Sequence, residues 1–212
     1  MDLDESRREY DFGHLDRQSL SDSPFHQFQK WMGEAIDSGI KDPTAMCIAT
    51  VGKDGKPSQR IVLLKHFDEK GLVFYTNLES RKAMEIADNP AVSLHFPWMK
   101  IDRQVAIEGR AEKLGLSTVL KYFVSRPIES QLAAWSSPQS RKIDTRSMLE
   151  DEYKRMQMKF AQGKIPVPSF WGGYRVVPDQ WEFWQGGEHR LHDRFQYSHS
   201  ADGGWVINRL AP

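Results

Sequence analysis

The sequence predicts a mainly β, α+β fold, a small antiparallel barrel with helical inserts. One observation is a series of short apolar runs, several alternating with polar residues, at intervals marked by Gly, Pro, Asn and Asp. A second is that stretches with apolar residues at helical spacing interrupt this series. The 212 residues suit one domain, or at most two small ones, and we expect a single domain over residues 23–212.

The chain begins with a segment that differs from the rest. Residues 1–22 are charged and carry few core-forming side chains, so we expect a mobile arm that a partner or ligand orders. Ser23 and Pro24 then form a typical helix start, with Pro at the first helical position. The helix is expected to run to Gly39, with these apolar residues at helical spacing: Phe25, Phe28, Trp31, Met32, Ala35 and Ile36.

A β-hairpin is predicted over residues 44–67, where TAMCIATV and SQRIVLLKHF flank the turn sequence GKDGKP. A clean alternation from residue 104 puts Val105, Ile107, Gly109 and Ala111 on one strand face. The other predicted elements are strands over 72–77, 91–97, 172–178, 180–185, 191–198 and 205–210, and helices over 80–89, 117–125 and 144–162.

Composition excludes several classes of protein. Lys and Arg number 29 and Asp and Glu also 29, and zero net charge argues against a general nucleic-acid or anionic-membrane binder. A single Cys excludes a disulfide framework and any multi-cysteine metal site. The longest apolar stretch, about 45–51, is far shorter than the ~20 residues of a membrane helix. With no secretory signal at the N-terminus, we expect a soluble cytoplasmic protein.

The first candidate site is the segment from Tyr75 to Lys82. A strand ends there, Ser80 can cap a helix, and Arg81 and Lys82 occupy its first turn, where cations oppose the helix dipole. Free backbone N–H groups, a hydroxyl and two cations form a plausible phosphate cradle. The alternative is two solvated side chains that tolerate a small cost.

The second candidate site is Arg190, His192 and Arg194. If the segment is a strand, all three lie on one face, where like charges are unfavourable unless an anion compensates. The alternative is a basic edge strand that prevents aggregation. A zinc site at His189 and His192 is disfavoured, because flanking arginines repel a cation.

Two further groups are less specific. Arg60 and Lys65 bracket an apolar strand, and their odd spacing puts them on opposite faces unless a bulge intervenes. Tyr122 and Arg126 are i, i+4 neighbours on a helix that Pro127 ends, and Ser130 lies one turn into the next; together they can bind a phosphate dianion.

Cys47 lies with Ala45, Ala49 and Val51 on one strand face, which predicts a buried structural thiol rather than a nucleophile. The sequence contains no Walker-type glycine loop and no G-x-S-x-G elbow. Scattered cation-plus-hydroxyl clusters without net charge favour two small anionic, aromatic ligands over one polymer. The residues alone leave the chemistry open.

Six segments in order resemble the pyridoxine/pyridoxamine 5′-phosphate oxidase family: RIVLLK (60–65), FYTNLESRKA (74–83), KYFVSRP (121–127), PSFWGGYRV (168–176), EFWQGGEHRLHDRF (182–195) and the terminal NRLAP. The resemblance runs from about Arg7 to Pro212. It implies an FMN-binding split β-barrel, antiparallel and homodimeric, with FMN at the subunit interface. It also implies oxidation of pyridoxine or pyridoxamine 5′-phosphate to pyridoxal 5′-phosphate by hydride transfer from C4′. Dioxygen would reoxidise the flavin to give hydrogen peroxide, with ammonia released from the amine. No metal is implied.

The resemblance also implies roles for residues at matching positions. Arg190 and His192 would be catalytic and hold the pyridine ring. The substrate set would be Arg7, Arg8, Tyr10, Lys65, Tyr122, Arg126, Ser130, Arg190 and His192. The FMN set would be Arg60, Ile61, Val62, Leu63, Leu64, Lys65, Tyr75, Thr76, Arg81, Lys82, Gln104, Gln139, Ser140, Trp184 and Arg194. Arg7, Arg8 and Tyr10 would close over the substrate as a lid.

Two other functions compete with this interpretation. A flavin-binding split-barrel reductase or carrier with another substrate would keep Arg81 and Lys82 but lack the Arg190/His192 pair. A phospholigand- or RNA-binding module without catalysis would explain cations next to aromatics. Its affinity would fall steeply with salt, and zero net charge argues against it.

Overall fold

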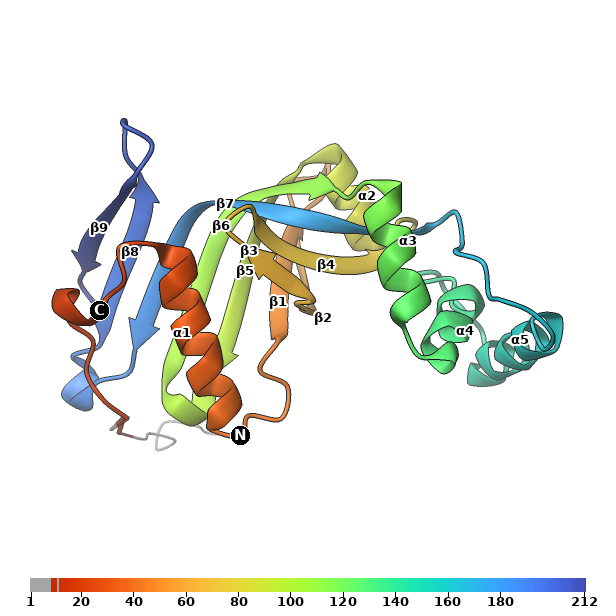
Figure 1. Ribbon diagram of the computed structural model, residues 1–212, viewed down its shortest axis with the longest axis horizontal. Coiled ribbons are helices and arrows are strands. Elements are labelled where there is room, and N and C mark those ends of the chain that lie inside the picture. The colour runs from red at the N-terminus through yellow and green to blue at the C-terminus, as the bar shows by residue number, and fades with distance from the viewer. Residues whose placement is uncertain (1–8, 11) are drawn as a thin grey trace.

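The computed structural model describes residues 9–10 and 12–212, and within them nine strands form one curled antiparallel sheet (Figure 1). The predicted mainly β fold with helical inserts is therefore confirmed. The strands are β1 (Ala45–Val51), β2 (Pro57–Leu63), β3 (His66–Asp68), β4 (Gly71–Asn77), β5 (Ala91–Trp98), β6 (Arg103–Lys113), β7 (Trp171–Gln185), β8 (Asp193–His199) and β9 (Trp205–Leu210). The helices are α1 (Pro24–Asp37), α2 (Arg81–Asp88), α3 (Leu116–Ser125), α4 (Ile128–Ser136) and α5 (Arg146–Lys159), with short 3₁₀ turns η1 (Arg17–Ser19), η2 (Met99–Ile101) and η3 (Glu188–Arg190).

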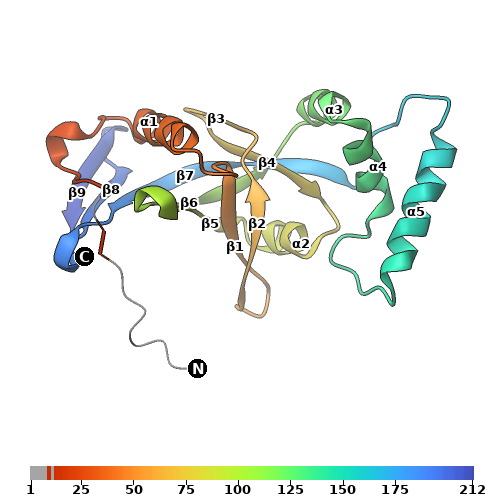
Figure 2. The ribbon, with the colours of Figure 1, turned by 90° about the horizontal axis from the view of Figure 1, so that it is seen from below.

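The long strand β7 organises the molecule. It pairs with β6 along most of its length, with β4 through its first half and with β8 through its second half. As a result, β8 and β9 lie at one end of the molecule and α3 to α5 at the other, in both views (Figures 1 and 2). Tyr75 on β4 is paired with Gly173, and Arg194 on β8 with Trp184.

One face of the sheet forms the core with α1. Phe28 of α1 is fully buried and its ring contacts Phe96, Trp98 and Trp181. Burying each large aromatic side chain stabilises the fold by about 2–3 kcal/mol. The predicted apolar face of β6 is confirmed, because Val105, Ile107, Gly109 and Ala111 are all buried.

The opposite face of the sheet is open. One row of paired residues crosses seven strands there, and every member is half-buried or exposed: Ile61, Cys47, His95, Ala106, Glu182, Gln196 and Asn208. Cys47 was predicted to be a buried thiol. That prediction is wrong, because the buried face of β1 is the one that carries Met46, Ile48 and Thr50.

Two strand predictions also need correction. Residues 172–178 and 180–185 form the single strand β7 rather than two strands. A register shift at Glu108/Gly109 accommodates Pro178, and a Cβ at Gly109 would lie 2.2 Å from the Val177 carbonyl oxygen. Only glycine permits this approach.

The second correction concerns the predicted strand over 191–198, because β8 begins only at Asp193. Arg190 and His192 therefore do not stack along a strand face with Arg194. They lie in and just after the turn η3, where His189 and Arg190 both have positive φ (53° and 63°).

Part of the segment 1–22, which we expected to be an arm, packs against the core. Leu15 and Leu20 are buried in the core, and the Tyr197 hydroxyl donates to the Ser21 carbonyl at 2.7 Å. Arg7 and Arg8 lie outside the described residues. In the part of the chain that the structure describes, no helix combines the length and apolar character needed to cross a membrane.

Candidate functional site

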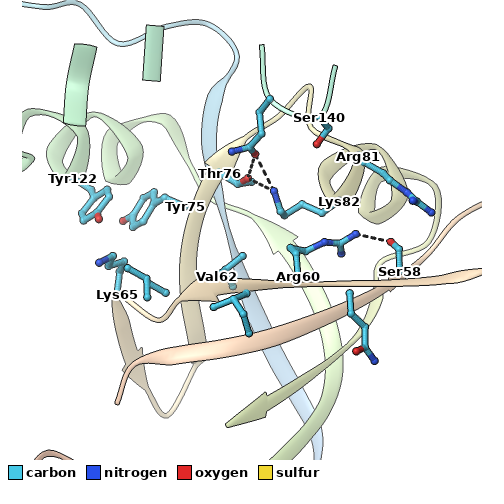
Figure 3. Close-up of a pocket in the computed structure, with 14 residues that line it drawn as sticks. Ser58, Arg60, Val62, Lys65, Tyr75, Thr76, Arg81, Lys82, Tyr122 and Ser140 are labelled. Carbon is cyan, nitrogen blue, oxygen red and sulfur yellow. Dashed lines mark hydrogen bonds between the residues drawn. The ribbon is translucent and has the colours of Figure 1, made fainter. Parts of the chain in front are cut away.

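A cavity of about 570 Å³ lies where the edge strand β2, the strand β4 and the start of α2 meet (Figure 3). Its lining is Ser58, Gln59, Arg60, Ile61, Val62, Leu63, Lys65, Tyr75, Thr76, Arg81, Lys82, Tyr122, Gln139 and Ser140. Arg60, Arg81 and Lys82 gather at one end, which we call the basic end. Lys65, Tyr75 and Tyr122 lie at the other, the aromatic end.

The basic end follows from how β4 passes into α2. The strand ends at Asn77, and α2 begins at Arg81 with Ser80 as its N-cap residue. The Ser80 side chain makes no capping hydrogen bond to this helix. Two cations thus stand at the positive end of the helix dipole, where neither is stabilised by the helix itself.

Lys82 is the most confined of these cations. It is buried, and its ammonium donates to Gln139 Oε1 at 2.9 Å, Thr76 Oγ1 at 3.1 Å and Ser80 Oγ at 3.3 Å. All three acceptors are neutral, so no carboxylate compensates the charge through these bonds. Burial and the nearby Arg60 lower the pKa of Lys82 to about 8. An anion in the cavity would supply the missing counter-charge.

A carboxylate instead compensates Arg60 and Arg81. Glu85 Oε2 accepts from Arg60 Nη2 at 3.3 Å and Ser58 Oγ at 2.6 Å, and Oε1 accepts from Arg81 Nε at 2.7 Å. Burial raises the pKa of Glu85, but hydrogen bonds from Ser58, Thr50, Arg81 and Arg60 outweigh it and lower the pKa to about 2. Glu85 is therefore a charged group at neutral pH.

The aromatic end presents a flat wall. The rings of Tyr75 and Tyr122 stack at 3.8 Å with 11° between their planes. Burial raises the pKa of both phenols, so both are neutral donors at pH 7. Lys65 lines the cavity beside them. The strand β2 ends at Leu63, two residues earlier, so the alternation of side chains along β2 does not extend to Lys65. Arg60 and Lys65 consequently line the same cavity, and their odd spacing does not separate them.

Arg126 lies one turn beyond Tyr122, outside the cavity lining. Its guanidinium stacks on Trp171 at 4.3 Å, and within the described part of the chain its buried Nη1 has no hydrogen-bond partner. Burial lowers the pKa of Arg126. Ser130 is in the first turn of α4 and half-buried. An unpaired guanidinium nitrogen of this kind suits an anionic ligand.

A second cluster surrounds the turn that carries Arg190 and His192. The His192 ring lies 4.7 Å from Trp184 and 5.3 Å from Tyr10, and its Nδ1 accepts from the Gly187 N–H at 3.1 Å. Arg190 is exposed. We call this group the turn cluster.

Gln104, Trp184 and Arg194 continue the turn cluster onto the sheet. They lie side by side on β6, β7 and β8, on the open face. Arg194 forms a bidentate ion pair with Glu182, at 2.9 and 3.0 Å. The pKa of Arg194 is raised by that hydrogen bond.

The two groups of predicted residues do not meet within one chain. Gly173, beside Tyr75, and Trp184 are separated along β7 by roughly 35 Å at the rise of a strand. Leu64 was also expected at the cofactor, but its side chain is buried in the core. Sequence reasoning missed Ser58, Gln59 and Glu85, although Ser58 shares a strand face with Arg60 and Glu85 follows Arg81 by one helical turn.

Known proteins match the chain over its whole length. The family model described as "Pyridoxamine 5'-phosphate oxidase" matches residues 32–160, and "Pyridoxine 5'-phosphate oxidase C-terminal dimerisation region" matches 171–212. Proteins named pyridoxine/pyridoxamine 5'-phosphate oxidase from Photobacterium profundum and Vibrio cholerae are 59% and 58% identical over 212 residues, covering 100% of both chains.

Solved structures match the fold. PhzG from Burkholderia lata, in complex with tetrahydrophenazine-1-carboxylic acid, superposes with a TM-score of 0.87 at 26% identity, covering 93% of this chain and 98% of that chain. A pyridoxamine 5'-phosphate oxidase-related, FMN-binding protein from Nostoc punctiforme gives 0.72 at 16% identity, covering 92% and 99%.

Proposed function

Because this chain belongs to the pyridoxine/pyridoxamine 5′-phosphate oxidase family, we propose that it is an FMN-dependent oxidase that makes pyridoxal 5′-phosphate. Its substrates would be pyridoxine 5′-phosphate and pyridoxamine 5′-phosphate, in the biosynthesis and salvage of vitamin B6. Relatives of that name match the chain from end to end, which supports the assignment.

One observation carries the cofactor proposal. Lys82 is a buried ammonium with neutral acceptors only, at a helix start that also holds Arg81. A phosphate monoester fits such a donor set, and the 570 Å³ cavity extends from it to the tyrosine wall. We therefore assign the basic end to the phosphate of FMN.

The open sheet face and the distance along β7 support a homodimer. Roughly 35 Å of strand is longer than one flavin nucleotide can bridge, so the turn cluster of one chain would serve the cavity of another. The matched dimerisation region, 171–212, contains β7, β8 and β9, which carry three of the seven residues of the open row. A two-fold axis would give two such sites, each built from both chains.

The chain's own residues would bind and orient the substrate. Lys65, Tyr122, Arg126 and Ser130 would hold the substrate phosphate, since Arg126 has an unpaired guanidinium nitrogen. Arg190 and His192 of the partner copy would hold the pyridine ring. Tyr10, packed on His192 and Trp184, would exclude water together with Arg7 and Arg8. FMN, when bound, would supply the acceptor for the hydride from C4′ and would pass the two electrons to dioxygen, giving hydrogen peroxide.

An anaerobic absorbance experiment tests this function. FMN-loaded protein receives pyridoxine 5′-phosphate without oxygen, and the flavin band is followed. We expect the band to bleach and to recover when air is admitted, with hydrogen peroxide formed. A band that does not change would mean a flavin-binding barrel with a different substrate. A folded protein that takes up no FMN would refute the cofactor assignment.

A further inference from the structure

Glu85 lies behind the basic end and does not line the cavity. Its carboxylate nevertheless joins three elements, because it accepts from Thr50 of β1, from Ser58 and Arg60 of β2, and from Arg81 of α2. The side chain is only 8% exposed, so this network replaces its hydration. Arg60 and Arg81, by contrast, both reach the cavity.

Local helix energetics do not explain the Glu85–Arg81 pair. In an i, i+4 pair the acidic residue is better placed nearer the helix N-terminus, and here the order is reversed. A buried carboxylate beside a phosphate site also opposes anion binding by charge. Glu85 is thus unfavourable both for the helix and for anion binding. Its contacts indicate another role, which is to hold Arg60 and Arg81.

We propose that Glu85 is a positioning residue for the cofactor phosphate, which holds the Arg60 and Arg81 guanidinium groups together on the cavity wall. Oε1 holds Arg81 directly, and Oε2 accepts from Arg60 at 3.3 Å. Oε2 also accepts from the Thr50 and Ser58 hydroxyls, and these hydroxyls in turn accept from the Arg60 guanidinium. The carboxylate and its two hydroxyl donors thus give the two cations a fixed separation. The inference rests on the proposed function, since it takes FMN as the ligand. Lys82 is fixed separately, by Thr76, Ser80 and Gln139, and does not depend on Glu85.

The test compares FMN with riboflavin, which lacks the phosphate. In Glu85→Gln the carboxamide cannot accept from both arginines with full charge. We expect the Kd for FMN, followed by quenching of flavin fluorescence, to rise about tenfold, the loss of one charge-assisted hydrogen bond. The Kd for riboflavin should stay within about twofold. Asp88→Asn, on the same helix and in an exposed ion pair with Lys53, is the matched control and should leave both constants unchanged.

A second variant separates position from charge and serves if Glu85→Gln does not fold. Glu85→Asp keeps the charge but shortens the side chain, so a positioning role again predicts weaker FMN and unchanged riboflavin. In an Arg81→Ala background the effect of Glu85→Gln should shrink to about threefold, because only Arg60 remains to be positioned.

Three outcomes would overturn the proposal. The first is an FMN affinity that is unchanged or tighter in Glu85→Gln, and the second is an Asp variant that behaves as wild type. The third is an equal loss of FMN and riboflavin, which would mean a structural role only. If the folded wild-type protein binds neither flavin, the proposed function itself fails, and that result is distinct from the other three.

Discussion

The basic end of the cavity and the turn cluster differ in how firmly a single chain holds their side chains in place. At the basic end, Lys82 and Glu85 are buried, and the ammonium of Lys82 and both carboxylate oxygens of Glu85 are hydrogen-bonded. In the turn cluster, Arg190 is exposed, and it follows His189 in a second successive left-handed conformation. Each such conformation costs about 1–3 kcal/mol unless surrounding groups compensate it. We therefore propose that folding of one chain preorganises the half of the site assigned to the phosphate, and that assembly with a partner and substrate stabilises the other half.

The largest effect is expected for a variant of the turn cluster, which should lose activity without losing the cofactor. Arg190→Met should lower kcat/KM by about 10²-fold or more, because the substrate ring loses its orientation. FMN content should stay near normal, since we assign the cofactor phosphate to the basic end. Steady-state kinetics with flavin absorbance measure both. Arg146→Met, on the exposed surface of α5, is the matched control. Loss of flavin in the Arg190 variant would mean that the two regions are not independent.

The opposite result is expected at the basic end. Lys82→Met should weaken FMN binding about 10- to 100-fold, through the loss of a charge-assisted hydrogen bond in a buried site. The flavin-free protein should be as stable as wild type or more stable, because a buried ammonium with neutral partners has been removed. Flavin titration and thermal unfolding of both proteins check this. A destabilised flavin-free variant with unchanged FMN affinity would contradict the assignment.

The pH dependence of FMN binding also distinguishes the basic end from the turn cluster. The pKa of Lys82 is lowered to about 8 by burial and by Arg60, and a bound phosphate favours the ammonium and raises that pKa again. Above pH 8 binding must therefore take up a proton, and the Kd for FMN should rise up to about tenfold per pH unit. Titrations from about pH 7 to about pH 10 should show this in wild type and in Arg190→Met, and not in Lys82→Met. The same slope in all three would exclude Lys82 as the titrating group.

The smallest effect concerns the packing that supports the turn cluster. A Cβ at Gly186 would lie 2.7 Å from the Tyr10 ring, so Gly186→Ala should displace Tyr10 from His192. An aromatic contact contributes about 0.5–1.5 kcal/mol, and we expect KM for the substrate to rise about threefold with FMN affinity unchanged. Gly33→Ala on α1, where a methyl group meets nothing within 4 Å, is the control. An unchanged KM would mean that Tyr10 does not support the substrate.

Periodicity predicted those parts of the fold that are set by local burial. The hairpin of β1 and β2, the helix α1 and the buried face of β6 all follow from alternating or helical patterns. The continuity of β7 did not, because it depends on a register shift opposite Gly109 on a neighbouring strand. The turn at Arg190 was missed for a similar reason, since left-handed conformations are uncommon in residues other than glycine and no local sequence pattern marks this one.

The residues of the candidate site also fall into those that the local sequence predicts and those that only the fold brings together. The cluster of cations at the helix start was predictable because Ser80, Arg81 and Lys82 are neighbours in sequence, and its role as a phosphate cradle stays a prediction. Glu85 was not singled out, because its partners Thr50 and Ser58 come from two other strands. Burial of Lys82 beside Gln139 likewise joins residues far apart in the chain. Residue types and spacing predict which groups bind an anion, and only the fold determines which of them are held together.

In the proposed dimer, one site takes its phosphate-binding half from one chain and its turn cluster from another. Arg126→Met chains and Arg190→Met chains, each nearly inactive alone, can be combined and the mixed dimers purified through two affinity tags. Each mixed dimer would then hold one site with both defects and one intact site, so we expect about half of wild-type activity at saturating FMN. Mixed dimers no more active than the two parent variants would contradict the account, because both halves would then belong to the same chain.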